Sequence, residues 1–387
     1  MEFFTYRNTT ELIFGRGAET HLAKVLAEKC GAKKALLLYG QGSAVRSGLV
    51  DRVKAEAEKV ALQTVVKGGV QPNPTIEFVR EALELARQEG VDSVIAVGGG
   101  SVIDTAKTVA AAFRYEGDPW DFFTGKVEPK DVLTLGVVLT IPAAGSEQSK
   151  RAVITNGNEK RGMGNDALRP RVSAVNPELF FTLSPTQTAA GVFDIMSHIM
   201  ERYFTKTQNV EFTSVEAEGA LRVIMENALK LKDDPKNYAA WCEVASAGSF
   251  AHCGFFGLGH EEDWACHGME HALSGWVPSI THGAGLAILT PAWMRYVWSE
   301  YPERFVRFAV HVMDIEPLES DEATIKLAIA KLCGFIQQME LPTSIHEVTS
   351  EKPDLDLLAK LSFGKGKLGG LKKLTHEDAK NIFESVI

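Results

Sequence analysis

Two short stretches in the second half of the chain carry side chains that can bind a metal ion. One is His267-Gly-Met-Glu-His271, from which ten residues separate His282; the other is Asp194-Ile-Met-Ser-His198. Residues four apart share one face of a helix, and the Gly and Pro between residues 274 and 279 allow the chain to turn and bring His282 back. The pattern predicts one carboxylate and four imidazoles on two helical segments.

This donor set suits a borderline divalent ion such as Fe(II) or Zn(II), because soft thiolates and an all-oxygen shell are both missing. A single Asp/His pair at this spacing is more often a surface helix pair. Asp194 and His198, however, lie among apolar residues such as Phe193 and Ile195. Such a setting would bury the charge and require a partner, which favours the metal site. Adjacent helical residues point about 100° apart, so we expect Cys266 to be a buried thiol rather than a ligand beside His267.

A glycine-rich turn in the first half of the chain is the candidate phosphate-binding loop. Gly98-Gly-Gly-Ser101 directly follows the apolar run 93–97 and opens a helix. Glycines let the backbone approach phosphate, and Ser101 with Asp104 predicts a capping box at a helix terminus that favours an anion. The turn lacks the G-x-G-x-x-G fingerprint, and a tight strand-to-helix connection would look similar.

The segment Tyr39-Gly-Gln-Gly-Ser-Ala-Val-Arg46 bears on the choice of nucleotide. A site that prefers NAD usually places an acidic residue after a strand to hold the ribose hydroxyls. Here no Asp or Glu occurs, whereas a hydroxyl and Arg46 do. The segment therefore favours NADP(H) over NAD(H), although a solvated surface turn has a similar composition.

The elements that must position these groups fall into two domains. Short apolar runs at residues 35–39, 62–66, 93–97 and 133–140 alternate with amphipathic stretches such as 75–88, which predicts a parallel sheet covered by helices. From about residue 181 helical periodicity dominates, and Ser184 or Thr186 can cap the helix that carries Asp194. We predict an α/β dinucleotide-binding domain over residues 1–180 and an all-α metal-binding domain over residues 181–387.

Length, charge and cysteines limit the class of protein. At 387 residues two domains are expected, and a net charge of -9 without a basic run argues against a nucleic-acid surface. We find no signal peptide and no apolar run long enough to cross a bilayer, so we expect no membrane partner. Five scattered cysteines without C-x-x-C argue against a disulfide framework, and a cytoplasmic enzyme is the simplest inference.

The chain as a whole resembles the iron-containing, group III alcohol dehydrogenases, in particular the NADP(H)-using butanol dehydrogenase and aldehyde reductase branch. The motifs that carry the resemblance occur in the family's order: Phe14-Gly-Arg-Gly17, Pro72-Asn-Pro74, Gly98 to Lys107, Gly145-Ser-Glu147, Asn176-Pro-Glu-Leu179, Asp194-x3-His198, His267-x3-His271, His282-Gly and Leu368-Gly-Gly370. The resemblance implies a dehydroquinate synthase-like fold with a metal in the cleft between its two domains, a small alcohol or aldehyde as substrate, and a homodimer.

Site residues also follow from the resemblance. It implies that one divalent metal, Fe2+ or else Zn2+, is held by Asp194, His198, His267 and His282, with His271 near the nicotinamide. The expected cofactor-binding positions are these: Gly40, Gly42, Ser43, Gly98, Gly99, Gly100, Ser101, Asp104, Thr140, Ser146 and Lys160.

Three departures from the family pattern stand out. Ala143-Ala-Gly-Ser-Glu147 lacks a hydroxyl that the family commonly has, and Asn176 replaces the usual Asp. Ten residues separate His271 from His282 where nine are expected, so the connection must absorb one residue for His282 to reach the metal.

The expected chemistry is reversible hydride transfer between NADP(H) and a small primary alcohol or aldehyde such as butanol or butanal, with the metal as Lewis acid. His271 is a candidate proton relay, with a core histidine as the equal alternative. Four aromatic residues form either an apolar wall of the substrate site or part of the core: Phe255, Phe256, Trp264 and Trp276. Rival functions are a glycerol or polyol dehydrogenase, a dehydroquinate synthase-type lyase, and a non-enzymatic metal- or cofactor-binding module.

Overall fold

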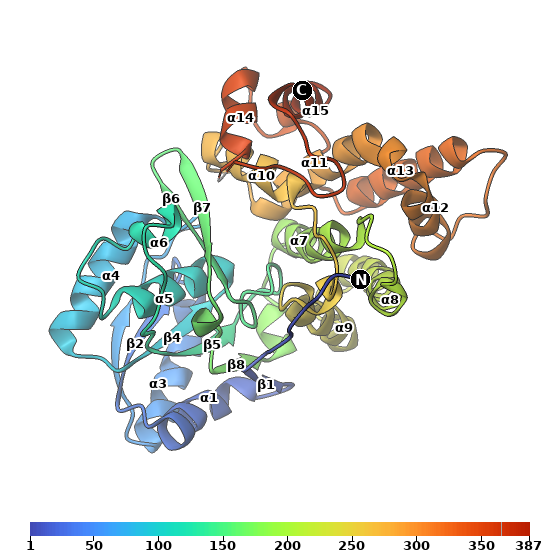
Figure 1. Ribbon diagram of the computed structural model, residues 1–387. Coiled ribbons are helices and arrows are strands. Elements are labelled where there is room, and N and C mark those ends of the chain that lie inside the picture. Colours follow the sequence, from blue (N-terminus) through green and yellow to red (C-terminus); the bar gives the residue numbers. More distant parts are fainter. Residues whose placement is uncertain (365) are drawn as a thin grey trace. The chain divides into compact units, whose positions relative to one another are not determined.

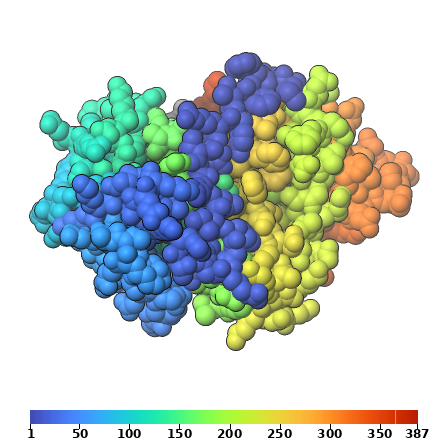
Figure 2. Space-filling model, turned by 90° about the horizontal axis from the view of Figure 1, so that it is seen from below, coloured from blue at the N-terminus to red at the C-terminus, as the bar shows by residue number. Residues whose placement is uncertain are grey.

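The computed structural model describes residues 1–364 and 366–387, which form two compact units (Figure 1). One unit comprises Arg7–Thr182, and the other comprises Leu183–Ile387 together with Met1–Tyr6. Residues 1–6 thus belong to the helical unit rather than to the predicted first domain. The backbone N–H of Glu2 donates to the carbonyl of Gly259 in that unit at 2.9 Å. The N-terminal residues, dark blue in Figure 2, lie at the surface.

A six-stranded, fully parallel sheet forms the centre of the first unit. Its strands have the order β1-β8-β5-β4-β2-β3. Their bounds are β1 Glu11–Phe14, β2 Lys34–Tyr39, β3 Gln63–Lys67, β4 Ser93–Gly98, β5 Thr134–Leu139 and β8 Val172–Val175. The four predicted strands match β2, β3, β4 and β5, and the expected parallel sheet is confirmed. The central strand β4 is buried along its whole length, which explains its unbroken apolar run.

Helices and one hairpin complete this unit. Their bounds are α1 Leu22–Lys24, α2 Ser43–Arg46, α3 Leu49–Lys59, α4 Ile76–Glu89, α5 Gly100–Ala112 and α6 Asp121–Thr124, with β6 Arg151–Asn156 and β7 Glu159–Gly164 paired antiparallel. The hairpin and the strands β1 and β8 were not predicted. β1 and β8 have only four residues each, and β7 reads Glu-Lys-Arg-Gly-Met-Gly with one large apolar residue, so none of these shows a clear strand pattern.

The sheet brings the candidate nucleotide-binding segments to one edge. Tyr39 of β2 pairs in register with Val97 of β4, and Gly98 pairs with Leu139 of β5, so all three strands end together. The chain leaves β2 towards β3 on one side and leaves β4 towards β5 on the other. Ligands of open α/β sheets bind at such a switch point, outside the carboxyl ends of the strands.

The second unit is helical, as predicted, and its described residues form no strand. Its helices are α7 Pro185–Tyr203, α8 Glu211–Asp233, α9 Tyr238–Ala251, α10 Ala265–Trp276, α11 His282–Val297, α12 Pro302–His311, α13 Asp321–Gln338, α14 Leu355–Ser362 and α15 His376–Glu384. Ser184 caps α7 in a capping box with Gln187, which decides between the two predicted caps. Among the described residues, no helix has the length and apolar character needed to cross a membrane.

Asn176 has a structural reason to replace the usual Asp. Its buried side-chain amide donates to Glu19 Oε2 at 2.9 Å, and its Oδ1 accepts from the backbone N–H of Glu178 at 3.1 Å. A second carboxylate at this buried position would face Glu19 as a like charge, which is unfavourable.

Candidate metal centre and nucleotide-binding edge

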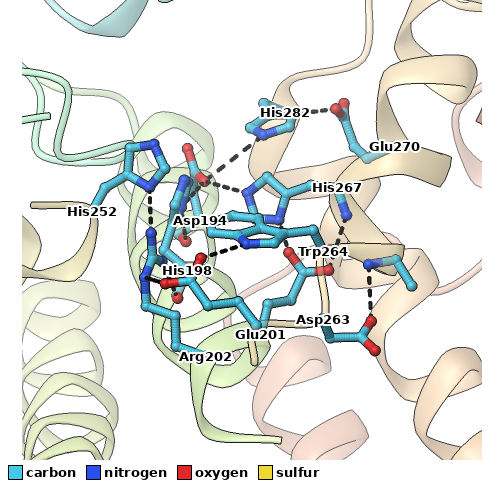
Figure 3. Close-up of polar contacts among 12 residues, drawn as sticks. Asp194, His198, Glu201, Arg202, His252, Asp263, Trp264, His267, Glu270 and His282 are labelled. Carbon is cyan, nitrogen blue, oxygen red and sulfur yellow. Dashed lines mark hydrogen bonds and ion pairs between the residues drawn. The ribbon is translucent and has the colours of Figure 1, made fainter. Parts of the chain in front are cut away.

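Three of the predicted metal ligands meet where α11 packs against both α7 and α10 (Figure 3). Oδ1 of Asp194 lies 4.0 Å from Nε2 of His267 and 4.0 Å from Nε2 of His282. One ligand atom from each of these residues lies within 4.8 Å of the other two. Residues 277–281 connect α10 to α11, and with ten residues between His271 and His282 the imidazole of His282 still lies beside Asp194.

The donor atoms fit a divalent metal ion. Nε2 of His267 is buried and has no hydrogen-bond partner among the described residues. Its separation from Asp194 Oδ1 is too long for a hydrogen bond. A buried polar atom without a partner is costly, and a shared cation would satisfy both atoms at once.

His198 lies beside this group rather than within it. Its Nδ1 is 2.9 Å from the backbone carbonyl of Asp194 and 2.9 Å from Asp194 Oδ1. Its ring centroid is 4.3 Å from that of His267. The structure thus brings Asp194, His267 and His282 into one group and places His198 next to it, and the role of His198 as a fourth ligand stays a prediction.

The electrostatic setting favours the metal-binding forms of two ligands. Burial alone would raise the pKa of Asp194, but the neighbouring His282 and His198 outweigh it and hold that pKa below its usual value. Burial, reinforced by His198 and His282, holds the pKa of His267 well below its usual value. A carboxylate and a neutral imidazole are the protonation states that bind metals.

Gly283 allows α11 to approach α7 closely enough for His282 to reach Asp194. A Cβ atom at this position would lie 1.8 Å from the backbone carbonyl oxygen of Ala190. A backbone atom at so short a distance cannot move aside as the end of a flexible side chain can. The glycine that follows His282 therefore sets the distance between two of the helices that carry ligands.

We expect Gly283→Ala to weaken metal binding at least about tenfold, because α11 must move away from α7 and carry His282 with it. The measurement is metal content and metal affinity of the purified variant, with circular dichroism to verify the helical fold. Gly334→Ala is the matched control, since Gly334 also lies inside a helix but has open space around its Cβ position. Unchanged metal affinity in Gly283→Ala would contradict this account of the α7–α11 contact.

Two buried glutamates contact the predicted ligands, and sequence reasoning missed both. Glu201 contacts Nδ1 of His267, and Glu270 contacts Nδ1 of His282. A signal for Glu201 was present, since it lies seven residues after Asp194 and hence on the same face of a mostly buried helix. His271 is half-buried, and its ring centroid lies 5.6 Å from that of His282. Its role as a proton relay stays a prediction.

Of the four aromatic candidates, Trp264 is in ring contact with the metal group. Its ring centroid is 5.1 Å from that of His267, and the Arg202 guanidinium lies 4.4 Å from the centre of a Trp264 ring. The Trp264 indole N–H also donates to Glu262 at 2.6 Å. Phe255 instead packs with Phe212, Phe250 and the buried Phe256. Trp276 is half-buried at the end of α10.

The acidic run at residues 260–263 lies directly before α10. It is irregular, and Asp263 accepts from the backbone N–H groups of Ala265, Gly370 and Leu371. Burial, together with the charge of Glu201, raises the pKa of Asp263 to about 7. These contacts join the run to the chain near residue 370. Cys266 is a buried thiol, as expected, and burial raises its pKa.

The glycine turn after β4 is tightly packed. A Cβ atom at Gly98 would lie 2.4 Å from Val102, and one at Gly99 would lie 2.2 Å from Ile141. The predicted capping box is wrong: the helix begins at Gly100, Gly99 is its N-cap, and no side chain caps it. Asp104 instead accepts from Ser146 Oγ at 2.7 Å and from the backbone N–H of Val153 at 2.9 Å.

Lys107, the last residue of the same motif, is fully buried and anchors the segment after β5. Its Nζ donates to the carbonyls of Ser146, Ser149 and Arg151 at 2.7–3.0 Å, and to the hydroxyls of both serines. Burial lowers the pKa of Lys107 to about 8. Ser146 is therefore bonded within the protein interior, between Lys107 and Asp104.

The remaining predicted cofactor positions lie in this unit as well. Gly40, Gly42 and Ser43 follow β2, and Ser43 opens α2 with its side chain exposed. Thr140 follows β5, and its backbone N–H donates to the carbonyl of Gly98 at 3.1 Å. Lys160 is half-buried on β7. The three strand ends thus place most of the predicted cofactor residues along one edge of the sheet.

Comparison with known proteins finds matches over both halves of the chain. Residues 9–177 match the family model described as iron-containing alcohol dehydrogenase, and residues 188–387 match the C-terminal model of the same family. The chain is 39% identical, over the full length of both chains, to a Bacillus subtilis protein named "Probable NADH-dependent butanol dehydrogenase 1". It is 32% identical, again over all of both chains, to the NADPH-dependent aldehyde reductase YqhD of Escherichia coli.

A solved structure has the same fold as this chain. The crystal structure of NADH-dependent butanol dehydrogenase A from Thermotoga maritima is 37% identical, with a TM-score of 0.96, and the match covers 100% of this chain and 99% of that one. Family models thus match both halves of the chain, the one with the glycine turn and the one with the histidine group. This chain belongs to the iron-containing alcohol dehydrogenase family.

Proposed function

We propose that this protein is a metal-dependent alcohol dehydrogenase and aldehyde reductase that interconverts small primary alcohols and aldehydes, such as butanol and butanal, with a nicotinamide cofactor. The observation that carries the proposal is the buried group of Asp194, His267 and His282, in which Nε2 of His267 has no partner among the described residues. Full-length relatives named butanol dehydrogenase and aldehyde reductase support it.

The residues of the metal group would hold one divalent ion, Fe2+ in our proposal, through Asp194, His267, His282 and the adjacent His198. When bound, such an ion supplies Lewis-acid stabilisation of negative charge on the substrate oxygen. Burial lowers the pKa of His267, which favours the neutral imidazole with a lone pair for the ion. We propose that His271, beside His282, passes a proton between the substrate oxygen and solvent.

The glycine turn would bind the cofactor's phosphates through its backbone. Gly100 and Ser101 open α5 directly after the carboxyl end of β4, and the N–H groups of a helix N-terminus favour an anion. Gly98 and Gly99 have no side chains that would keep a phosphate away from this backbone.

The test is turnover of butanal with NADPH and with NADH, followed by absorbance of the reduced nicotinamide. We expect a chelator to lower turnover at least about a hundredfold and Fe2+ or Zn2+ to restore it, because the Lewis acid supplies several kcal/mol. Glycerol and other polyols serve as competing substrates. Turnover that survives complete metal removal would contradict the proposal, and glycerol turnover above that with butanal would move it to a polyol dehydrogenase.

We also propose that NADP(H) is preferred. No carboxylate stands between residues 39 and 46 to repel a 2'-phosphate, and Arg46 is exposed on α2 directly after β2. The names of the relatives include both cofactors, so the preference rests on these residues.

Arg46→Ala should raise KM for NADPH about tenfold and leave KM for NADH unchanged, because one charge-assisted contact to the 2'-phosphate is lost. Steady-state kinetics with both cofactors measure this. Arg52→Ala is the control, since Arg52 lies on the next helix, where its guanidinium Nε is 3.9 Å from Glu19. Equal changes in KM for both cofactors would count against a contact to the 2'-phosphate.

We further propose a homodimer that works in the cytoplasm on a small alcohol or aldehyde, without nucleic-acid or membrane partners. The net charge of -9 and the absence of a basic run in the sequence support the exclusion of nucleic acid. Sedimentation velocity of the purified protein would test the dimer.

A further inference from the structure

Glu201 ties one predicted ligand to the helix that carries another. It lies on α7, is 2% exposed, and its Oε2 accepts a hydrogen bond from Nδ1 of His267 on α10 (Figure 3). Its other oxygen accepts from the backbone N–H of His267 at 3.2 Å. One carboxylate thus fixes both the side chain and the backbone of His267.

Glu270 makes the corresponding contact to His282. It lies on α10, is fully buried, and its Oε2 directly contacts Nδ1 of His282 at the start of α11. Gly285 leaves room for this arrangement, because a Cβ atom there would lie 2.8 Å from Cγ of Glu270.

The two contacts have the same consequence for the imidazoles. A carboxylate at Nδ1 retains the proton on that nitrogen and leaves the lone pair on Nε2. In both histidines Nε2 is the atom that lies 4.0 Å from Oδ1 of Asp194. Each carboxylate therefore selects the tautomer and the ring orientation that aim a lone pair at the same point.

We propose that Glu201 and Glu270 are positioning residues that preorganise His267 and His282 for one divalent metal ion. This inference rests on the proposed function, because it assumes that the same group binds the metal of the reaction. Glu201 joins α7 to α10 and Glu270 joins α10 to α11, so the two pairs also hold together the three helices that supply the ligands.

A second ion between Glu270, His271 and His282 is the alternative reading, since one ligand atom from each of these residues also lies within 4.8 Å of the other two. The direct contact between Glu270 Oε2 and His282 Nδ1 leaves no room for an ion between them. The paired arrangement is therefore favoured, and metal stoichiometry distinguishes the two.

The experiment titrates Zn2+ or Co2+ into the metal-free full-length protein, without substrate or cofactor. Glu201→Ala and Glu270→Ala should each raise the Kd for the metal 10- to 100-fold, the range found for removing such outer partners. Glu201→Gln and Glu270→Gln keep an oxygen acceptor and should lose less. The Co2+ absorption spectrum should change in both alanine variants, because the ligand orientation relaxes.

Glu218→Ala is the matched control. Glu218 is also a buried glutamate of the helical unit, but its partners are Tyr203 and Arg307 rather than a histidine. This variant should lose stability and keep the wild-type Kd and Co2+ spectrum. Gly285→Ala is a second variant for Glu270, since it displaces the carboxylate without removing its charge, and it should also weaken metal binding.

Folded Glu201→Ala or Glu270→Ala protein with a Kd within twofold of wild type would overturn the proposal for that residue. Two ions per wild-type chain and one per Glu270→Ala chain would overturn it for Glu270 in favour of a second ion. Because metal affinity is measured without turnover, failure of this proposal is distinguishable from failure of the proposed function, in which the protein binds metal but reduces no aldehyde.

Discussion

His267→Ala is expected to abolish both metal binding and alcohol dehydrogenase activity, with turnover falling roughly a thousandfold or more. His267 lies at the centre of the group: its Nε2 faces Asp194, its Nδ1 is held by Glu201, and its ring is adjacent to those of His198 and His282. Its loss removes one ligand and leaves the buried Glu201 carboxylate without its histidine, which is costly. Lewis-acid stabilisation worth several kcal/mol would disappear with the ion.

Metal analysis and butanal turnover of the purified variant provide the measurement. Cofactor binding, followed by nicotinamide fluorescence, should survive, because the glycine turn belongs to the other compact unit. His311→Ala, which removes an exposed imidazole at the end of α12, is the control. Retained metal stoichiometry in His267→Ala would overturn the ligand assignment.

Gly99→Ala is expected to impair the cofactor site and leave the metal site intact. Its Cβ would lie 2.2 Å from Cγ2 of Ile141, a branched side chain that cannot swing away freely, so the turn after β4 or the segment after β5 must move. We expect KM for the nicotinamide cofactor to rise at least about tenfold. Overpacking of this kind should also lower the free energy of unfolding by roughly 1–3 kcal/mol.

Gly100→Ala controls for the loss of stability, because its Cβ would make an ordinary contact, 3.6 Å from Cβ of Ala144. Steady-state kinetics give KM, chemical denaturation gives the free energy of unfolding, and metal analysis should give the wild-type value for both variants. An unchanged KM in Gly99→Ala would show that the turn does not shape the cofactor site.

The two sites use different physical means to present their ligands. At the sheet edge, backbone geometry supplies the donors, so glycines and helix starts matter more than any one side chain. In the helical unit, side chains from α7, α10 and α11 supply the donors. Helix packing and buried carboxylates therefore determine the orientation of these side chains. For this reason Gly283→Ala is expected to change metal affinity, whereas Gly99→Ala is expected to change KM for the cofactor.

What the sequence by itself determined is local. The apolar runs predicted β2, β3, β4 and β5, and the residues four apart predicted which face of α7 and of α10 carries the ligands. Such features depend on neighbours within one turn or one strand, whose periodicity is visible in the order of residues. The identity of the family followed from the order of these local motifs.

Only the tertiary structure decided which distant residues the side chains of these local motifs contact. Asp104 pairs with Ser146, 42 residues away, and not with the helix start, because a hairpin packs over it. Glu201 contacts His267 across 66 residues, and Gly283 matters only because the backbone of α7 lies against it. Contacts between distant segments depend on how helices and strands pack, and one sequence carries no periodic signal for that.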